Sequence, residues 1–484
     1  MELLERARQW ASHDPDPASA SSLSADIEAA QRGDEEAAAR VGAAMNGPLQ
    51  FGTAGLRGVV GPGESRMNLA VVIRATAGLC EVVKRHATAN PTPLTSFSML
   101  HFDADAGVMV TASHNPAPDN GYKVYLGGTV AQGDGRGVQI VPPFDAEIAA
   151  AIEAAPPADE VPMNDDLIEA VDPREEYVAC ASALASGEAS AREDLRIVLT
   201  AMHGVGAAIT SRVLSEAGFS HVSLVAAQAD PDPDFPTVPF PNPEEAGALD
   251  MAIEQAREQG ADLIIAVDPD ADRCALAVPD PTSEMGWSPL SGDQIGSLLG
   301  EFLASRGMKG SLANSIVSSR LLSRIARAHG LDHHTTLTGF KWIARAPGLG
   351  FGYEEAIGFC PDPAHVRDKD GIATSVVAAS LVAALKAQGC SVWDELERLA
   401  RLHGLHVSSP LTFRVEQIEQ IASGMARLRA QPPSVLAGSP VVEVSDLSQG
   451  YRGLPPTDGV LVLTEAGDRV IARPSGTEPK LKCY

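Results

Sequence analysis

The sequence predicts an α/β fold: three similar α/β domains with mixed, mostly parallel sheets, followed by a smaller C-terminal α+β domain. The chain of 484 residues is too long for a single hydrophobic core. At about 150 residues per domain, roughly three or four domains are expected. Short apolar runs alternate with helical patterns over most of the chain, which is typical of α/β layers. Beyond residue 403 a helix is followed by hairpin-like strands, which favours a separate α+β domain.

We expect the domain boundaries where composition and pattern change. A linker-like stretch occupies residues 188–192, and a strand pattern restarts shortly after it. The expected domains are residues 1–188, 189–306, 307–402 and 403–484.

Composition limits the classes of partner. Hydrophobic residues make up 44% of the chain, as in an ordinary globular protein. The formal net charge of −26 argues against binding nucleic acid or an anionic membrane, because both are recognised by basic surfaces. We therefore expect small-molecule partners, no nucleic acid and no membrane. An anionic substrate would require cations concentrated locally at its site.

Cysteine usage and the start of the chain indicate a cytoplasmic protein. The six cysteines are scattered without a CxxC pair, which favours reduced side chains over disulfides or a zinc site. The first ten residues are charged and amphipathic, unlike a secretion signal. The apolar stretch 372–387 is shorter than the roughly 20 residues that span a bilayer, and we expect a buried alanine-rich helix there.

The first fifty residues are expected to be helical and acidic, ending at Asn46-Gly47-Pro48. A glycine-rich loop at residues 51–58 follows and carries Arg57. Such loops let backbone N–H groups approach an anion, although glycines near one arginine are common by chance. Asn68 is then expected to cap a helix with apolar residues at helical spacing.

The next elements surround Ser113. An apolar strand at residues 107–110 ends in the loop TASHNP, and a second strand at 122–125 carries Lys123. Asn-Pro stiffens the loop, because proline fixes its own backbone and restricts the preceding residue. A nucleophile on a stiff loop near a cation suits group transfer. From this stretch alone, an ordinary surface turn is an equal alternative.

The remaining elements continue the α/β pattern. They are a helical acidic passage at 145–186, strands at 195–199, 222–225, 262–267 and 275–278, helices at 204–217, 247–259 and 318–330, a proline-rich loop at 230–245, a charged loop at 352–371, a helix at 415–428 and a final strand pair flanking 474–479.

Three carboxylates at alternate positions, Asp268, Asp270 and Asp272, follow the strand 262–267. They cannot all ionise cheaply side by side without a cation between them. Mg²⁺ prefers carboxylate oxygens and binds most usefully beside a phosphate. A calcium EF-hand does not fit, because Arg273 and Pro279 stand where that loop needs Gly and Glu. A solvated acidic turn is the minor alternative.

Two further loops carry residues that could bind a phosphate or sugar hydroxyls. RPSGTEP at residues 473–479 combines an arginine, two hydroxyls and a glycine, as in a phosphate cradle, although a tight hairpin explains it equally well. GYEEAIG at 352–358 offers adjacent glutamates for sugar hydroxyls, and Arg367 and Lys369 could reach a phosphate. A solvated charged loop is the usual alternative.

Together these motifs resemble one family. TASHNP, DPDADR, GYEEAIG and RPSGTEP occur in the order and spread of the α-D-phosphohexomutases, the phosphoglucomutase and phosphomannomutase superfamily. TAGLRG, MHGVG, TGFKW and RDKDG add to the match. The resemblance covers nearly the whole chain, and TASHNP with DxDxDR at this separation is highly specific.

The resemblance implies four domains around a central cleft: in chain order, a phosphoserine, a metal-binding, a sugar-binding and a phosphate-binding domain. It implies an isomerase that interconverts glucose and/or mannose 1-phosphate and 6-phosphate through a phosphoserine and a sugar 1,6-bisphosphate. The implied cofactors are one Mg²⁺ per chain and the sugar 1,6-bisphosphate as activator. The implied partners are sugar phosphates, and the chain is expected to be a monomer or a homodimer.

The resemblance also assigns residues. Ser113 would carry the phosphoryl group, and Ser113, Asp268, Asp270 and Asp272 would hold Mg²⁺. Arg57, His114 and Lys123 are candidates for stabilising that group and moving a proton. We favour Lys123 as proton carrier, because neighbouring cations can lower the pKa of a lysine. The implied substrate-binding residues are Arg273, Thr338, Gly339, Lys341, Glu354, Glu355, Arg367 and Lys369. The implied phosphate-binding residues are Arg473, Ser475, Gly476 and Thr477.

Three departures from the family pattern leave alternatives open. Tyr353 and Ala356 replace a glycine and a serine of the usual GEES-like sugar loop, so a phosphopentomutase acting on ribose phosphates is one alternative. A strand expected between His86 and Pro93 is missing, and the chain stops at Tyr484, mid-strand by the family pattern. We expect residues to be absent from this sequence there, because losing a core strand should unfold the first domain.

Other classes are weaker alternatives. A catalytically silent sugar-phosphate binder would explain the missing strand and the altered sugar loop, although Ser113 and the three aspartates are intact. A serine hydrolase is disfavoured, because no GxSxG motif surrounds Ser113. A metal-dependent phosphatase would need a route for water that the sequence does not reveal.

Overall fold

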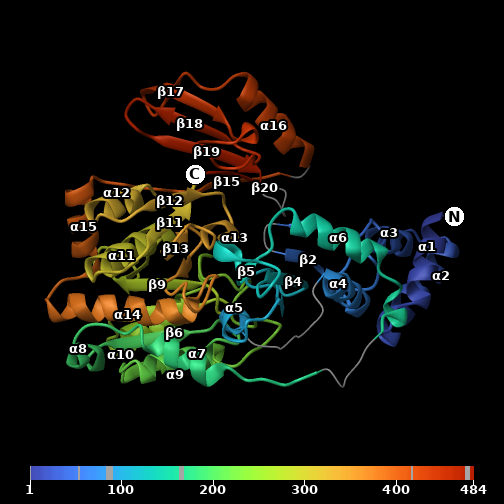
Figure 1. Cartoon of the computed structure of the whole chain (residues 1–484), viewed down its shortest axis with the longest axis horizontal. Coiled ribbons are helices and arrows are strands. Elements are labelled where there is room, and N and C mark those ends of the chain that lie inside the picture. The colour runs from blue at the N-terminus through green and yellow to red at the C-terminus, as the bar shows by residue number, and fades with distance from the viewer. Residues whose placement is uncertain (1, 53–54, 83–90, 163–167, 416–417, 475–479) are drawn as a thin grey trace. The chain divides into compact units, whose positions relative to one another are not determined.

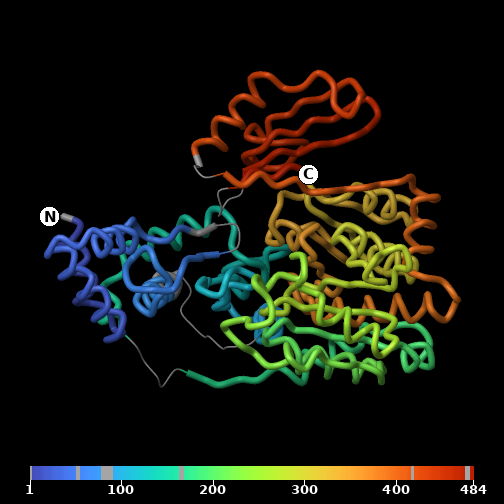
Figure 2. The backbone as a smooth tube through the Cα atoms, turned by 180° about the vertical axis from the view of Figure 1, so that it is seen from behind, coloured from blue at the N-terminus to red at the C-terminus, as the bar shows by residue number. Residues whose placement is uncertain are grey.

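The computed structural model describes residues 2–52, 55–82, 91–162, 168–415, 418–474 and 480–484 (Figures 1 and 2). The chain forms two compact units. The first unit contains Met1–Leu290 and Gly358–Val392, and the second contains Ser291–Ile357 and Trp393–Tyr484.

The first unit begins with three helices: α1 (Glu2–Ser12), α2 (Pro17–Gln31) and α3 (Glu35–Ala44). Side chains satisfy the free N–H groups at two of their starts. Asp16 accepts from the Ala18 N–H of α2, and Asp34 accepts from the Ala37 N–H of α3. The predicted helical start of the chain is confirmed. Both views show these helices gathered beside α4 (Leu69–Val82) and α6 (Phe144–Ala154).

The first sheet carries the Ser113 loop. Its strands are β1 (Phe51–Gly52), β2 (Gly55–Val59), β3 (Ala106–Val110), β4 (Asp119–Leu126) and β5 (Val138–Gln139). The order is β1-β2-β4-β3 with β5 on β4, and these pairs are antiparallel. Tyr122, Val124 and Leu126 of β4 are buried against residues that include Met67 and Ile148. These alternate residues of β4 point to the same face of the sheet, and their burial anchors the strand that carries Lys123.

Two predictions concern the segment between β2 and β3. Asn68 caps α4 as predicted, since its Oδ1 accepts from the Val71 N–H at 2.9 Å. The strand expected between His86 and Pro93 falls mainly on residues 83–90, which lie outside the described residues. From Thr92 the chain forms helix α5 (Thr92–His101).

The second sheet carries the acidic loop. Its strands are β6 (Arg196–Thr200), β7 (His221–Leu224), β8 (Leu263–Val267), β9 (Cys274–Pro279) and β10 (Trp287–Pro289). The order is β10-β9-β8-β6-β7, with parallel pairing around β6 and antiparallel pairing around β9. All five residues of β8 are buried, as expected for a continuous apolar run in the middle of a sheet.

Helices and one strand complete the first unit: α7 (Arg174–Ser182), α8 (Ala189–Glu193), α9 (Ala207–Glu216), α10 (Asp250–Gln259), β14 (Gly358–Cys360) and α14 (Gly371–Ala387). Nearly every residue of α14 is buried, so the predicted alanine-rich core helix is confirmed. Within the described residues, no single helix is long and apolar enough to cross a membrane; only α14 and α15 (Val392–His403), taken together as a bent pair, meet that length and composition.

The second unit contains a parallel sheet and an antiparallel one. The parallel strands are β12 (His333–Thr336), β11 (Ser311–Ser315) and β13 (Leu349–Glu354), with β11 in the middle. The antiparallel order is β15 (Leu411–Arg414), β20 (Lys480–Cys483), β19 (Arg469–Pro474), β18 (Val460–Thr464), β17 (Ser439–Asp446) and β16 (Val435–Leu436). The helices are α11 (Gly292–Ser305), α12 (Leu321–Ala328), α13 (Phe340–Ile343), α15 and α16 (Ile418–Ala430).

The predicted fold class is confirmed: α/β layers with mixed sheets precede a C-terminal α+β portion. The first sheet differs in detail, because its described pairs are antiparallel where mostly parallel strands were expected. The physical reason is that β3 and β4 form a hairpin around the Ser113 loop, and hairpin strands run antiparallel. The division into four domains stays a prediction.

Candidate active site

The Ser113 loop leaves β3 through a strained turn. Ser113 has a φ of +54°, a left-handed conformation that costs energy for a residue with a Cβ. The loop is held by local hydrogen bonds: the Ser113 N–H donates to Thr111 Oγ1 at 2.8 Å, and the Asn115 N–H donates to the Ala112 carbonyl at 3.1 Å. Arg57 Nη1 donates to Asn115 Oδ1 at 2.8 Å. These hydrogen bonds fix the conformation of the loop, and Asn115 links it to Arg57.

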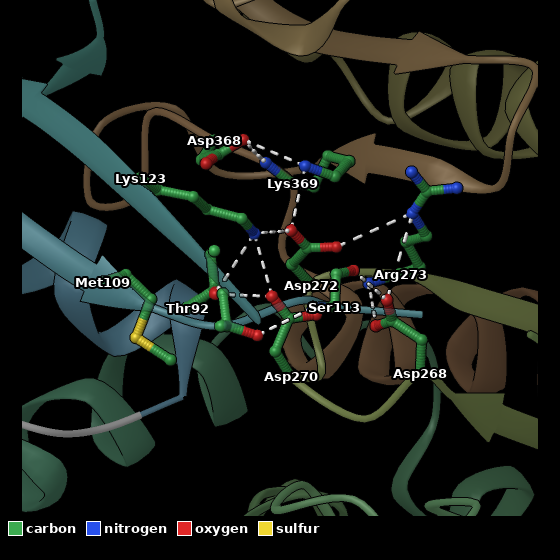
Figure 3. Close-up of polar contacts among 12 residues, drawn as sticks. Thr92, Met109, Ser113, Lys123, Asp268, Asp270, Asp272, Arg273, Asp368 and Lys369 are labelled. Carbon is green, nitrogen blue, oxygen red and sulfur yellow. Dashed lines mark hydrogen bonds and ion pairs between the residues drawn. The ribbon is translucent and has the colours of Figure 1, made fainter. Parts of the chain in front are cut away.

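Ser113 points at the acidic loop of the second sheet (Figure 3). Its Oγ donates to Asp268 Oδ2 at 2.7 Å and lies 3.2 Å from His114 Nδ1. Burial lowers the pKa of His114 well below its ordinary value, and the nearby Arg273 and Arg57 guanidinium groups lower it further. His114 is thus held as a neutral imidazole beside the serine hydroxyl.

The three aspartates converge after β8. Asp268, Asp270 and Asp272 are all buried, and one carboxylate oxygen from each lies within 4.8 Å of those of the other two. A turn brings them together: the Ala271 N–H donates to the Asp268 carbonyl at 2.8 Å, and Ala271 has a φ of +57°. The alternate spacing in the sequence therefore becomes one carboxylate cluster.

Lys123 enters this cluster from β4. Its Nζ donates to Asp270 Oδ2 and to Asp272 Oδ2, each at 2.8 Å, and to Thr92 Oγ1 at 3.3 Å. Burial by itself lowers the pKa of Lys123, but the Asp270 and Asp272 carboxylates outweigh it and raise that pKa above its ordinary value. The lowered pKa expected for Lys123 is therefore wrong, because its nearest charged neighbours are carboxylates.

Two more cations flank the aspartates. Lys369 Nζ lies 2.9 Å from Asp272 Oδ2 and 3.4 Å from Asp368 Oδ1. Arg273 Nε lies 3.9 Å from Asp268 Oδ2 and 3.8 Å from Asp272 Oδ1. The local concentration of cations that an anionic substrate requires is thus present inside an acidic protein.

The cluster fits a divalent cation. Asp270 Oδ1 and Asp272 Oδ1 are buried and, within the described residues, have no hydrogen-bond partner. Burial, together with the Asp270 and Asp272 charges, raises the pKa of Asp268 well above its ordinary value. A cation bound to these oxygens would satisfy the unpaired atoms and offset the repulsion, and all-oxygen ligands suit Mg²⁺.

Sequence reasoning missed Thr92 and Asp368. Thr92 is fully buried; its Oγ1 donates to Asp270 Oδ2 at 2.7 Å, and its N–H donates to the Asp270 carbonyl at 3.2 Å. Asp368 accepts from Tyr125 OH at 2.5 Å and from Gln139 Nε2 at 2.7 Å, beside Lys369. The rigid Pro-Thr-Pro at residues 91–93 was the only local signal of a positioned hydroxyl.

The sugar loop of the second unit is held from within. Glu355 Oε2 accepts from Ser315 Oγ and Ser318 Oγ, each at 3.0 Å. Burial first, then the Glu354 charge, raises the pKa of Glu355 to about 7. Tyr353 is fully buried and donates from its OH to Asp293 Oδ1 at 2.9 Å. Tyr353, which stands where the family pattern has a glycine, therefore supports the loop through its buried side chain.

The first unit brings together eight of the residues expected at the site: Ser113, His114, Lys123, Asp268, Asp270, Asp272, Arg273 and Lys369. Arg57 is linked to the Ser113 loop by its hydrogen bond to Asn115. Arg367 Nη2 lies 3.7 Å from Asp134 Oδ1 instead. Thr338, Gly339, Lys341, Glu354, Glu355 and Arg473 belong to the second unit. Ser475, Gly476 and Thr477 lie outside the described residues.

Three family models match the chain in sequence order. They are described as phosphoglucomutase/phosphomannomutase, alpha/beta/alpha domains I, II and III, and they match residues 82–158, 175–282 and 291–401. A "Probable phosphomannomutase" of Haemophilus influenzae is 45% identical over 402 residues, which cover 81% of this chain and 80% of that protein. The phosphopentomutase of Homo sapiens is 30% identical over 528 residues, which cover 90% and 84%.

A solved structure supports the fold. The open form of the Paramecium phosphoglucomutase pp63/parafusin matches with a TM-score of 0.67 and 17% identity, covering 90% of this chain and 89% of that one. At this identity the likeness concerns the arrangement of elements.

Proposed function

This chain belongs to the phosphoglucomutase/phosphomannomutase family, and on that premise we propose that it is a phosphohexomutase. As an isomerase of the intramolecular phosphotransferase type, it would interconvert the 1-phosphate and 6-phosphate of glucose and/or mannose. The observation that carries the proposal is the Ser113 hydroxyl at 2.7 Å from Asp268, within a buried three-aspartate cluster flanked by cations.

In the proposed reaction Ser113 is the phosphoryl carrier. The bond between Ser113 Oγ and phosphorus breaks as the free hydroxyl of a sugar monophosphate bonds to that phosphorus, and the hydroxyl proton passes to the neutral His114 imidazole beside Ser113. The product is a sugar 1,6-bisphosphate, which turns end for end. Its other phosphoryl group then returns to Ser113 Oγ as the bond between the sugar oxygen and that phosphorus breaks. The sugar oxygen takes the proton back from His114, and the isomeric monophosphate leaves. Trace bisphosphate would act as activator by phosphorylating Ser113.

Asp268, Asp270, Asp272 and the Ser113 oxygen are the proposed Mg²⁺ ligands. When bound, Mg²⁺ would offset the negative charge of the phosphoryl group, where most catalysis of phosphoryl transfer lies. Lys123 and Lys369 hold Asp272 from two sides at 2.8 and 2.9 Å, so they fix the carboxylate before any ligand arrives. Arg57, oriented by Asn115, is the proposed contact to the phosphoryl oxygens.

We assign sugar recognition to the second unit. Because Ser315 and Ser318 hold Glu355, Glu354 is the proposed contact to the sugar hydroxyls and Glu355 the residue that supports the loop. Thr338, Gly339 and Lys341 would lie beside the sugar. Arg473, Ser475, Gly476 and Thr477 would bind the phosphate that is not reacting. The support for these assignments is the family resemblance of their motifs.

A pentose substrate is the second candidate, favoured by the human phosphopentomutase relative and by Ala356, which stands where the usual sugar loop has a serine. The deciding experiment compares kcat/KM for glucose, mannose and ribose 1-phosphates, with Mg²⁺ and trace bisphosphate present. We expect one of the hexose phosphates to give the highest value. A higher value for ribose 1-phosphate would make the protein a phosphopentomutase, and no isomerisation of any of the three would make it a silent binder.

A further inference from the structure

The loop that carries the three aspartates is held by backbone from three other segments of the first unit. Its four successive carbonyl groups, at residues 268–271, each accept a hydrogen bond from a backbone N–H. One of these bonds is internal to the loop, from Ala271 to Asp268 at 2.8 Å. The other three run from Val205 to Pro269 at 2.9 Å, from Thr92 to Asp270 at 3.2 Å and from Gly371 to Ala271 at 3.2 Å. A loop whose carbonyl groups are all engaged in this way has little freedom to move.

Gly204 lies directly against the middle of this loop. A Cβ on Gly204 would stand 2.3 Å from Pro269 Cα and 2.5 Å from the Pro269 carbonyl oxygen, distances at which the atoms would overlap. The φ of Gly204 is not positive, so a residue with a side chain could adopt its backbone conformation but would not fit. Gly371 meets the loop at its other end in the same way, because its Cβ would stand 2.2 Å from the Arg273 carbonyl oxygen. Glycine at both positions therefore lets backbone pack directly on backbone.

The chain reaches Gly204 through two strained residues. Met202 and His203 have φ values of +49° and +62°, successive left-handed conformations that cost energy for residues with a Cβ. Hydrogen bonds hold both residues in place: the Met202 N–H donates to Thr200 Oγ1 at 3.0 Å, and the His203 N–H donates to the Gln228 carbonyl at 3.0 Å. Strain of this kind persists only where the surrounding structure over-determines it, and it is concentrated at functional sites.

We propose that residues 202–206, the MHGVG motif, are a positioning element for the metal ion of the candidate active site. Pro269 stands between Asp268 and Asp270, so the contacts that fix Pro269 also fix the separation of two of the proposed Mg²⁺ ligands. Metal sites depend on such outer contacts, because the ligand oxygens must be held at the spacing that the ion requires. The inference rests on the proposed function, since it takes the three aspartates as the Mg²⁺ ligands.

The test measures metal affinity directly on the full chain. Metal-free protein is titrated with Mn²⁺, free Mn²⁺ is followed by electron paramagnetic resonance, and Mg²⁺ is added as a competitor. Asp270→Ala identifies the Mn²⁺ that is bound at the aspartate cluster. Gly204→Ala places a methyl group against Pro269 and displaces the loop, so we expect it to weaken Mn²⁺ binding by at least roughly tenfold. Mg²⁺ activation of turnover should weaken in parallel, with a smaller loss of kcat at saturating Mg²⁺.

The matched control is Gly127→Ala, which lies in the same unit. A Cβ on Gly127 would stand 2.7 Å from the Ala104 carbonyl oxygen, and its nearest neighbours do not include the aspartate loop. Both variants should lose unfolding free energy, because each forces a methyl group into a close contact. Only Gly204→Ala should also lose metal affinity. Urea unfolding of the metal-free proteins measures the loss of stability separately from the loss of binding.

Wild-type protein that binds Mn²⁺ while Gly204→Ala binds it equally well would overturn the positioning role and leave the proposed metal ligands standing. An equal loss of affinity in Gly127→Ala would also overturn it. Wild-type protein that binds no Mn²⁺ would overturn both the positioning role and the metal ligands.

A milder variant decides the question if Gly204→Ala does not fold. The atoms nearest to a Cβ on Gly206 would be side-chain atoms, Ala271 Cβ at 2.8 Å and Val267 Cγ2 at 2.9 Å, so Gly206→Ala presses on the same loop with less overlap. We expect a severalfold loss of Mn²⁺ affinity in Gly206→Ala, and an unchanged affinity would overturn the proposal.

Discussion

Ser113 Oγ lies 2.7 Å from Asp268 Oδ2, although the two residues are 155 positions apart. The first sheet supplies the hydroxyl at the end of β3, and the second sheet supplies the carboxylate at the end of β8. The candidate site is therefore made where two sheets of one compact unit meet.

Ser113→Ala should abolish isomerisation while leaving substrate binding intact. The substitution removes the proposed phosphoryl carrier but no proposed substrate-binding group, so we expect kcat to fall by at least roughly a thousandfold. A coupled assay measures turnover and calorimetry measures binding of the sugar phosphate. Isotope from labelled sugar 1,6-bisphosphate should appear on wild-type protein and not on the variant. Turnover within tenfold of wild type would refute the carrier role.

Removal of divalent cations should stop turnover, and Mg²⁺ should restore it. Asp270→Ala deletes one of the converging carboxylates, and we expect it to weaken Mg²⁺ activation by at least roughly tenfold. The matched control is Asp280→Ala, since Asp280 follows β9 and is bonded to Thr282 and Ser288 away from the cluster. Mg²⁺ dependence that is equal in both variants would contradict the metal site.

Lys123→Met should destabilise the fold as well as the site. It leaves the buried Asp270 carboxylate without its ammonium partner and Asp272 with Lys369 alone. Breaking a buried pair typically costs about 3–5 kcal/mol. Urea unfolding measures the loss. Lys386→Met is the control, because the Lys386 side chain is 35% exposed and pairs with Asp262, also partly exposed; partly exposed pairs contribute about 1 kcal/mol or less. Equal losses of unfolding free energy in the two variants would show that the buried ion pair stabilises the fold no more than the partly exposed one.

Stability should fall as the pH rises from about 4 to about 7, through Asp370. Burial raises the pKa of Asp370 to about 7. In the unfolded chain its pKa is ordinary, about 4. Between these values the folded protein holds a proton that the unfolded chain has lost, so raising the pH favours unfolding; the upper limit of the effect is roughly 4 kcal/mol.

Asp370→Asn should remove this contribution. Asparagine keeps an oxygen for the bonds that Asp370 Oδ1 accepts from Tyr177 OH and from the Ala373 N–H at the start of α14. The urea midpoints of wild type and variant, measured at pH 5 and pH 8, give the comparison. We expect the variant to gain relative to wild type at pH 8, and an identical pH dependence would count against a protonated Asp370.

Polar loops after apolar strands pointed to Ser113 and the three aspartates, and the family resemblance implied that they lie together; the structure places Ser113 Oγ 2.7 Å from Asp268 Oδ2. The sequence did not predict the environment of Lys123. A lysine among many cationic motifs suggests a crowded positive site, but the structure pairs Lys123 with Asp270 and Asp272, and Lys369 with Asp272. Charge pairing depends on side-chain directions that only the folded sheets determine.

Thr92 and Asp368 escaped prediction for a related reason. The Thr92 bond to Asp270 spans 178 positions, and the Tyr125 bond to Asp368 spans 243. Thr92 carries no motif of its own, and Asp368 lies within RDKDG, which does not indicate the partners of its carboxylate. Tyr353 was read as a change in sugar recognition, whereas its burial and its bond to Asp293 show a residue that supports the loop.

The Lys369 contact with Asp272 has a consequence for protein synthesis. The chain leaves the ribosome from its N-terminus, and domains fold as they emerge. Ser113 and Lys123 emerge early, yet their carboxylate partners follow only at residues 268–272, and Lys369 is the last charge to reach Asp272. A nascent chain that stops short of Lys369 thus holds Ser113, the proposed phosphoryl carrier, before all the charges around Asp272 are present. The charge pairing around Asp272 is therefore expected to be completed late in translation, when the segment before α14 has emerged.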